Sequence, residues 1–450
     1  MKSETASETL GAFAAGVEFD DISAAARDRL KQCLIDAVAC VTYGATKPWA
    51  QYAMTVADQT GSSGHACLPG RTGQGMAPGP AALALGVCCH AFEQDGLRRP
   101  SVGVHGAATV AVPVLAMAQH LGKSGRDAIT AMAAGIEVMI RVGAATKHSP
   151  EKHGFHAPGL IGPYGGAVAC SKLMGADAKQ IVNAMGIAGS FSSGLLAFSK
   201  SKSGGMVKRL HMGRAAEGGV LAALLAAEGF EGPETVIDGK FGLLDAYCSE
   251  TDTSKLTAGL GSVWESETVC FKRYPAHITS HAPVTGLNAL REEHGFGADD
   301  IERIEIRGSK KITTHHDIKQ PGDIMQAQYS MPFNVARSLY HDIMDPDMLN
   351  DALLADEQVL AMAQKITLAV DEEVHKLRSW SAAMTVWLKD GRQFDKTVED
   401  WPGMPQMPFT DQQLADKFKL LTRSLANADE LLEKLQGLQD LESLRELNWT

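Results

Sequence analysis

The chain has 450 residues and a formal net charge of -11 at pH 7, with 45% hydrophobic and 21% charged residues. A chain of this length exceeds one ordinary hydrophobic core, so the sequence predicts a globular protein of two domains. The acidic balance argues against nucleic acid or an anionic membrane surface as the partner, because both require a basic surface. It leaves room for a small anionic substrate in a local basic pocket.

Residues 1–19 carry acidic groups and have no long apolar core, which is unlike a signal or transit peptide. Apolar stretches such as 107–118 are too short to span a bilayer and contain Pro113. These features predict a cytoplasmic protein that does not associate with a membrane. The eight cysteines are dispersed and form no CxxC pair, so neither a zinc ribbon nor a thioredoxin-like motif is indicated.

Helical spacing of apolar residues dominates the first part of the chain. The predicted helices, which are rich in Ala, Gly, Leu and Met, are 20–43, 79–93, 107–121, 126–146, 164–174, 178–198 and 210–228. Several of them are apolar most of the way round, which is typical of interior helices in a large helical domain.

The pattern changes after about residue 268. Strands are predicted within 301–309, 365–370 and 382–388, and Asp390-Gly391 predicts a tight hairpin after the last of these. Helices return after residue 404, where Thr410 and Gln413 resemble a capping box, and we expect them to pack on the first domain. The sequence therefore predicts a mainly α fold, with residues 1–267 and 404–450 in one all-helical domain and 268–403 in a smaller α+β domain.

A first polar cluster, HAFEQDGLRRPSVGVHGA (90–107), interrupts two apolar helices with an irregular, Gly- and Pro-containing loop. Its charged and titratable residues include Glu93, Asp95, Arg98, Arg99 and His105. Loops held between rigid helices often present catalytic groups, but a solvated interhelical turn would have the same composition.

Two further clusters lie at predicted helix starts. Residues 147–167 contain three histidines and predict a mobile loop leading into a helix whose N-terminus attracts anions; of the three, His156 has the most apolar surroundings. Residues 199–216 carry a Gly-Gly hinge before Lys208, which suits a carboxylate or phosphate site but also fits ordinary helix-start polarity. No GxxxxGK[ST] loop is present.

The stretch FKRYPAHITSHAP (271–283) gathers basic and aromatic polar groups without one acidic residue. We interpret Lys272, Tyr274 and His277 as anion-binding and proton-transfer groups. His277 and His281 have the spacing of two metal ligands on a helix, but there is no HExxH motif and Pro283 closes the segment, so no metal site is predicted. Tyr329, in QAQYSMPFNVA (326–336), fits a core tyrosine as well as a site residue.

Taken together, these stretches resemble the MmgE/PrpD family. The resemblance rests on the order and spacing of GIEVMIRVGAA (135–145), GFHAPGLIGPYGGAVACSKLMGAD (154–177), AMGIAGSFSSGLLAF (184–198), KRLHMGRAAEGGVLAALLAAEGFEGPETVIDGKFG (208–242) and FKRYPAHITSH (271–281). The family includes 2-methylcitrate dehydratases, cis-aconitate decarboxylases and iminodisuccinate epimerases. The resemblance implies a helical domain built from both chain ends, a smaller α+β lid, a homodimer, and an active site between the domains without an organic cofactor.

The resemblance also implies a set of site residues. The catalytic positions carry over onto His105, His156, Lys208, Lys272 and His277, with KRYPAH especially similar to the decarboxylase branch. Tyr329 falls roughly at a polar position of the lid. Where the family has a DFDDT-like run, this chain has FEQDGL, so Leu97 replaces the Thr. Glu93 and Asp95 then stand for the carboxylates, Arg98 and Arg99 add positive charge, and 2-methylcitrate dehydration is disfavoured.

These residues predict chemistry at a carbon next to a carboxylate. Lysines and an arginine would neutralise developing negative charge, and histidines, whose ordinary pKa is near neutrality, would move the proton. The leading interpretation is a lyase that dehydrates or decarboxylates a small di- or tricarboxylate. An epimerase of an iminodisuccinate-like dicarboxylate and a catalytically silent carboxylate-binding dimer are the alternatives.

Overall fold

The protein is described by a computed structural model that covers residues 4–61, 63–71, 75–98, 103–201 and 204–449. The chain forms two compact units. The helical unit contains Met1–Ala91, Asp95–Phe271 and Thr410–Thr450, and the α+β unit contains Phe92–Gln94 and Lys272–Phe409. The fold is mainly helical with a small sheet, as the sequence predicts.

The helical unit is built almost entirely from helices. They are α1 (Ala6–Gly16), α2 (Ala24–Gly44), α3 (Pro48–Thr60), α4 (Pro78–Cys89), α5 (Val112–Leu121), α6 (Gly125–Ala145), α7 (Ser149–Lys152), α8 (Ala157–Leu173), α9 (Ala178–Ala188), α10 (Val207–Ala227), α11 (Leu243–Tyr247), α19 (Asp411–Thr422) and α20 (Ala428–Gln436). A two-residue ladder joins β1 (Leu97–Arg98) to β2 (Val269–Cys270) in antiparallel register.

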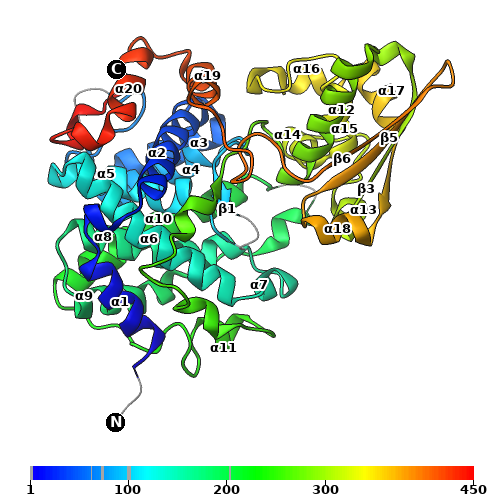
Figure 1. Cartoon of the computed structure of the whole chain (residues 1–450). Coiled ribbons are helices and arrows are strands. Elements are labelled where there is room, and N and C mark those ends of the chain that lie inside the picture. The colour runs from blue at the N-terminus through cyan, green and yellow to red at the C-terminus, as the bar shows by residue number, and fades with distance from the viewer. Residues whose placement is uncertain (1–3, 62, 72–74, 99–102, 202–203, 450) are drawn as a thin grey trace. The chain divides into compact units, whose positions relative to one another are not determined.

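Helices α6, α8 and α10 form the centre of this unit, with α8 packed against both of the others (Figure 1). Small residues allow the close approach: a Cβ on Gly135 would lie 2.4 Å from the backbone oxygen of Gly165, and one on Gly219 would lie 2.8 Å from the backbone of Ala167. Helix α6 is long and apolar enough to cross a membrane, but 94% of its apolar window is buried within the structure. It is therefore placed as a core helix.

Two predicted boundaries were wrong. The sequence predicts a mobile loop before residue 164, whereas α7 and α8 occupy most of it and α8 begins at Ala157. Pro158 lies in the first turn of α8, where a missing N–H costs nothing, and Pro163 is accommodated inside a helix that is buried at nearly every position. The helix predicted over 178–198 ends at Ala188 and continues as short 3₁₀ turns.

The C-terminal helices complete the helical unit, as predicted. Thr410 and Gln413 form the capping box that begins α19, and α19 and α20 (orange to red) lie beside α2 (blue) in Figure 1.

The Lys417 ammonium contacts Asp36 Oδ1 at 2.5 Å, and Asp36 Oδ2 accepts the Gly96 backbone N–H at 2.8 Å. Burial lowers the pKa of Lys417, but the negative groups around it, Asp36 foremost with Cys40 and Asp95, together outweigh burial and raise the pKa.

The α+β unit contains a four-stranded sheet of order β4-β3-β5-β6. Its elements are α12 (His281–His294), β3 (Ile301–Gly308), α13 (Lys310–His315), α14 (Ile324–Tyr329), α15 (Met331–Arg337), α16 (Asp351–Leu354), α17 (Glu357–Gln364), β4 (Ile366–Val370), α18 (Glu372–Leu377), β5 (Ala382–Leu388) and β6 (Gln393–Val398). Strand β3 pairs parallel to β4 and antiparallel to β5, and β5 and β6 form the predicted hairpin. All the predicted strands are confirmed.

We expect Lys417→Met to lower the free energy of unfolding by about 3–5 kcal/mol, because it leaves the Asp36 carboxylate buried without its cation. The measurement is urea unfolding at neutral pH. Lys419→Met is the control on the same helix, since Lys419 pairs with Asp429 where both side chains are largely exposed. Equal losses in the two variants would contradict a structural role for the buried pair.

Candidate active site

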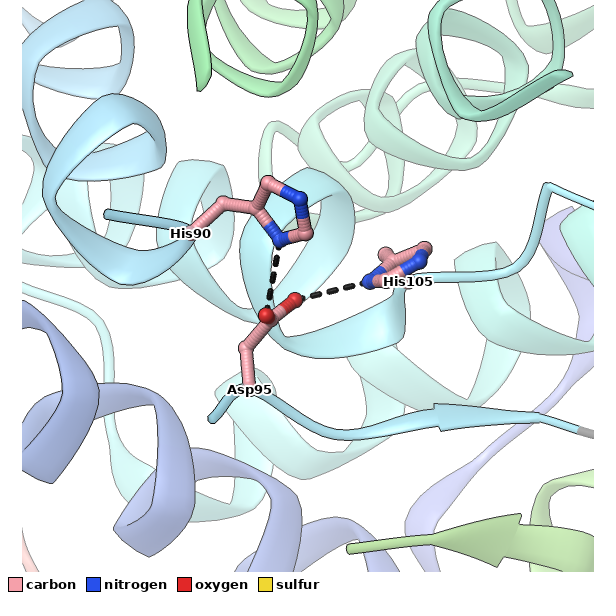
Figure 2. A group of neighbouring side chains, drawn as sticks. All are labelled: His90, Asp95 and His105. Atoms are coloured by element: carbon pink, nitrogen blue, oxygen red, sulfur yellow. Dashed lines mark hydrogen bonds and ion pairs between the residues drawn. The ribbon is translucent and has the colours of Figure 1, made fainter. Parts of the chain in front are cut away.

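The most developed polar cluster of the helical unit joins His90, Asp95 and His105 (Figure 2). His90 caps the C-terminal end of α4, and His105 lies just before the single-turn π-helix Ala107–Ala111. The Asp95 carboxylate lies between the two imidazoles, with Oδ1 2.7 Å from His90 Nδ1 and Oδ2 2.8 Å from His105 Nδ1. The side chains of His90 and Asp95 are fully buried, and that of His105 is 14% exposed.

The charge of Asp95 determines what this cluster can do. Burial alone would raise the pKa of the Asp95 carboxyl, but the two imidazoles outweigh burial and hold it well below its usual range. An ionised carboxylate only accepts hydrogen bonds, so both Nδ1 atoms donate to it. This leaves Nε2 of His105 as the atom that can take up or release a proton, and Asp95 stabilises the imidazolium that results.

The same three side chains supply donor types that bind metal ions, and their donor atoms lie within 4.8 Å of one another. Each carboxylate oxygen, however, already lies at hydrogen-bonding distance from one Nδ1 atom. We therefore interpret the cluster as a proton-transfer group.

A second pair of imidazoles lies at the start of α8 and on α10. His156 Nδ1 lies 3.0 Å from His211 Nδ1, and the Phe198 ring packs edge-on against both. The His156 backbone N–H donates to Gly194 O, which fixes the residue at the helix start. Burial lowers the pKa of His211 to about 4, helped by the charges of His90 and Lys208, so His211 is neutral near neutral pH. A neutral His211 can accept the Nδ1 proton of His156.

Lys208 is buried in the first turn of α10, close enough to His211 to lower its pKa. Arg98, which the sequence suggests for substrate binding, contacts Glu265 Oε2 at 2.5 Å and the Thr268 hydroxyl at 2.8 Å. The Arg98 charge is therefore paired with Glu265, next to the β1–β2 ladder. Arg99 lies outside the described residues.

Glu93 and Lys272 form a buried ion pair in the α+β unit, with Lys272 Nζ 2.9 Å from Glu93 Oε2. The segment Phe92–Gln94 is also held by Gln328, whose side-chain amide donates to Phe92 O at 2.9 Å. Glu93 adopts a left-handed backbone conformation with φ of 59°. Such a conformation costs a non-glycine residue about 1–3 kcal/mol and is often retained at functional sites.

Of the remaining predicted residues of the α+β unit, Tyr329 lies beside His277 and Tyr274 does not. The His277 ring stacks on His316 at a centroid distance of 4.3 Å and lies 4.9 Å from the Tyr329 ring. Its Nδ1 atom accepts from the Thr279 backbone N–H and lies 2.9 Å from the Thr279 hydroxyl, which leaves the proton of the neutral ring on Nε2. Tyr274 is buried and packs against His281 instead of His277.

The structure therefore places His90, Asp95 and His105 in one cluster, His156 with His211 in another, and Glu93 with Lys272 in a third. Sequence reasoning did not select His90, His211 or His316. His90 could have been found from its spacing to Asp95 at the end of an apolar helix. His211 could have been found from its position one turn after Lys208. His316 has no comparable sequence signal.

Comparison with known proteins gives one consistent result. The model of the MmgE/PrpD N-terminal domain matches residues 8–255, and that of the MmgE/PrpD C-terminal domain matches residues 274–441. A cis-aconitate decarboxylase of Aspergillus terreus is 26% identical over 97% of this chain and 94% of its own length. The cis-aconitate decarboxylases of Mus musculus and Homo sapiens are 27% and 26% identical over 88% and 82% of this chain, and over 83% and 78% of their own lengths.

We expect the low pKa of His211 to make stability depend on pH. The unfolded chain binds a proton at a histidine of pKa about 6.5, whereas folded His211 has a pKa of about 4. The native state therefore loses stability as pH falls from about 6.5 to about 4, and His211→Gln should lose less over that window. Urea unfolding at several pH values measures the difference. Parallel curves for the two proteins would show that His211 does not titrate as described.

Proposed function

The chain belongs to the MmgE/PrpD family, and from this premise we propose that it is a cofactor-independent lyase that acts on a small di- or tricarboxylate such as cis-aconitate or a citrate analogue. The observation that carries the proposal is the imidazole of His105, held by the buried carboxylate of Asp95 at 2.8 Å. The names of the relatives favour decarboxylation over dehydration.

Both lyase reactions develop negative charge on a carbon beside a carboxylate. In decarboxylation the bond to the leaving carboxylate breaks, its electron pair stays on the carbon, and a proton is then added there. In dehydration a base removes a proton from the carbon and an acid gives a proton to the leaving hydroxyl. His105 Nε2 can serve in either direction, because Asp95 stabilises the imidazolium and the neutral ring keeps a lone pair at Nε2.

Lys208 and Lys272 are the cations proposed to bind the substrate carboxylates. Both are buried, where a charge interacts more strongly than in water. The Glu93–Lys272 pair, 2.9 Å long, holds the Lys272 ammonium in place. Lys208 is held by its position in the first turn of α10.

The altered loop also favours decarboxylation. Where the family has the Thr of its DFDDT-like run, Leu97 is buried in the β1–β2 ladder and offers no hydroxyl. Asp95, in contrast, supplies a carboxylate and is fully engaged by two histidines. The carboxylate function of the run is thus retained while its hydroxyl is lost.

Epimerisation is the second candidate, because one observation favours it. His105 Nδ1 donates to Asp95, whereas His277 Nδ1 accepts from the Thr279 backbone N–H, so the two neutral rings carry their proton on different nitrogens. An epimerase requires one base and one acid.

Proton NMR in deuterium oxide distinguishes these reactions. We expect the purified protein to release carbon dioxide from cis-aconitate when it is offered 2-methylcitrate, cis-aconitate, citrate, iminodisuccinate and tartrate in turn. Loss of water from one compound would identify a dehydratase, and deuterium entering an α-carbon without other change would identify the epimerase. No reaction and no exchange with any compound would contradict both enzyme proposals and favour a silent carboxylate-binding protein.

We expect His105→Gln to lower kcat about 10²–10⁴-fold, the usual contribution of a general acid or base, on whichever compound reacts. His341→Gln is the matched control, because His341 also forms a histidine–aspartate pair, with Asp356 at 3.0 Å, but is assigned no role in the reaction. Steady-state kinetics on both variants gives the comparison. Equal activity of His105→Gln and wild type would exclude His105 as the proton-transfer group.

A further inference from the structure

Gln328 is a fully buried residue near the C-terminal end of α14, and it contacts two of the segments that carry candidate site residues. Its side-chain amide donates to Phe92 O at 2.9 Å, and its backbone O accepts the His277 N–H at 2.8 Å. Phe92 lies 236 residues before Gln328 in the chain. One residue of the α+β unit therefore holds both the segment before Glu93 and the backbone of His277.

The next carbonyl of this helix end holds the ring that packs on His277. Tyr329 O lies 2.9 Å from His316 Nδ1, and the nitrogen is the donor because a carbonyl oxygen only accepts. The His316 ring then stacks on the His277 ring at a centroid distance of 4.3 Å. The backbone and the ring of His277 are thus both fixed by two consecutive carbonyl groups of α14.

Asn334, on α15, holds this end of α14 in turn. Its side-chain amide nitrogen donates to Ala327 O at 2.9 Å and to Gln328 O at 3.3 Å. Its Oδ1 atom accepts the Nε–H of Arg337 at 3.0 Å. Because arginine has only donors, this bond determines which side of the amide faces α14. A charged donor at Oδ1 also makes the amide N–H groups stronger donors.

The Arg337 side chain is fully buried, and neither Nη atom has a hydrogen-bond partner among the residues that the structure describes. Burial lowers its pKa to about 9, against the opposing charge of Asp342, so the guanidinium stays charged near neutral pH. A buried charge without a paired carboxylate is costly for the fold, which indicates that its value lies in what it holds. We call Gln328, Asn334 and Arg337 the buried network.

We propose that the buried network positions the Lys272 ammonium and the His277 ring, and that its members are positioning residues for the proposed reaction. On the Lys272 side, Gln328 holds Phe92 O, and the next residue, Glu93, pairs with Lys272 at 2.9 Å. These two contacts enforce the left-handed backbone conformation of Glu93, which otherwise would relax. The inference rests on the proposed function, because that function assigns the substrate carboxylate to Lys272.

Gln328→Met tests the Lys272 side, because methionine fills a similar space without an amide. We expect KM for the compound that reacts to rise about 10-fold, the effect of one lost buried hydrogen bond on binding, with little change in kcat. Gln326→Met is the control on the same helix, since Gln326 accepts only from the exposed Gly322 N–H at 3.0 Å. Equal kinetic constants in the two variants would overturn the proposal.

Chemical labelling separates a failure of this inference from a failure of the proposed function. Acetic anhydride acetylates lysine side chains, and mass spectrometry measures the rate at each one. In Gln328→Met we expect labelling of Lys272 to be at least about 5-fold faster than in the wild type, because its buried segment opens more often. Buried Lys417 of the helical unit should be unchanged. An unaltered rate at Lys272 would overturn the inference whether or not any compound reacts, whereas an altered rate without any reaction would overturn only the proposed function.

Arg337→Met tests the His277 side and does not depend on the fate of the Gln328 variant. Because it removes a buried charge without a paired carboxylate, we expect the urea midpoint to be at least as high as in the wild type. The ¹⁵N resonances of the His277 ring should nevertheless shift, since Asn334 loses the contact that orients it, while those of His341 should not. Unaltered His277 resonances, or an unfolded variant, would contradict the role given to Arg337.

Discussion

The structure of the candidate site depends on one buried carboxylate, that of Asp95. An ionised carboxylate away from water is costly unless its oxygens accept hydrogen bonds, and here each oxygen accepts from one imidazole. The backbone beside it is fixed as well, because the Gly96 N–H donates to Asp36, which in turn pairs with Lys417. Helix α19 thus helps to hold the loop that orients His105, although Lys417 lies more than 300 residues further along the chain.

The short stretch FEQDGL (92–97) contributes residues to both compact units. Asp95 belongs to the helical unit, whereas Glu93 is paired with Lys272 in the α+β unit and adopts a left-handed backbone conformation. Two neighbouring carboxylates therefore have separate partners and separate tasks: one orients a histidine and the other orients a lysine. This division explains how the loop can differ from the family pattern, with a leucine in place of a threonine, and still retain both acidic functions.

Much of the fold could be predicted because it is periodic. The long apolar helices, the strands after residue 300 and the capping box at Thr410 follow from local spacing and local hydrogen bonds. The failures share another cause. Pro158 and Pro163 suggested a loop, but a proline is tolerated in a first turn and tertiary packing accommodates one inside a buried helix. The sequence singles out Asp95 and Lys272 as candidate site residues. It does not show that Asp95 contacts His90 and His105 or that Lys272 pairs with Glu93, because contacts between separated residues leave no local sequence pattern.

The proposed chemistry requires an ionised Asp95 that accepts the Nδ1 proton of His105 and leaves Nε2 as the reactive atom. Nitrogen NMR of protein labelled with ¹⁵N-histidine, compared between wild type and Asp95→Asn, tests this most directly. We expect a protonated Nδ1 on His105 in the wild type and a change of its protonation pattern in the variant, with the histidines outside the cluster unaltered. A wild-type His105 whose neutral ring carries its proton on Nε2 would contradict it.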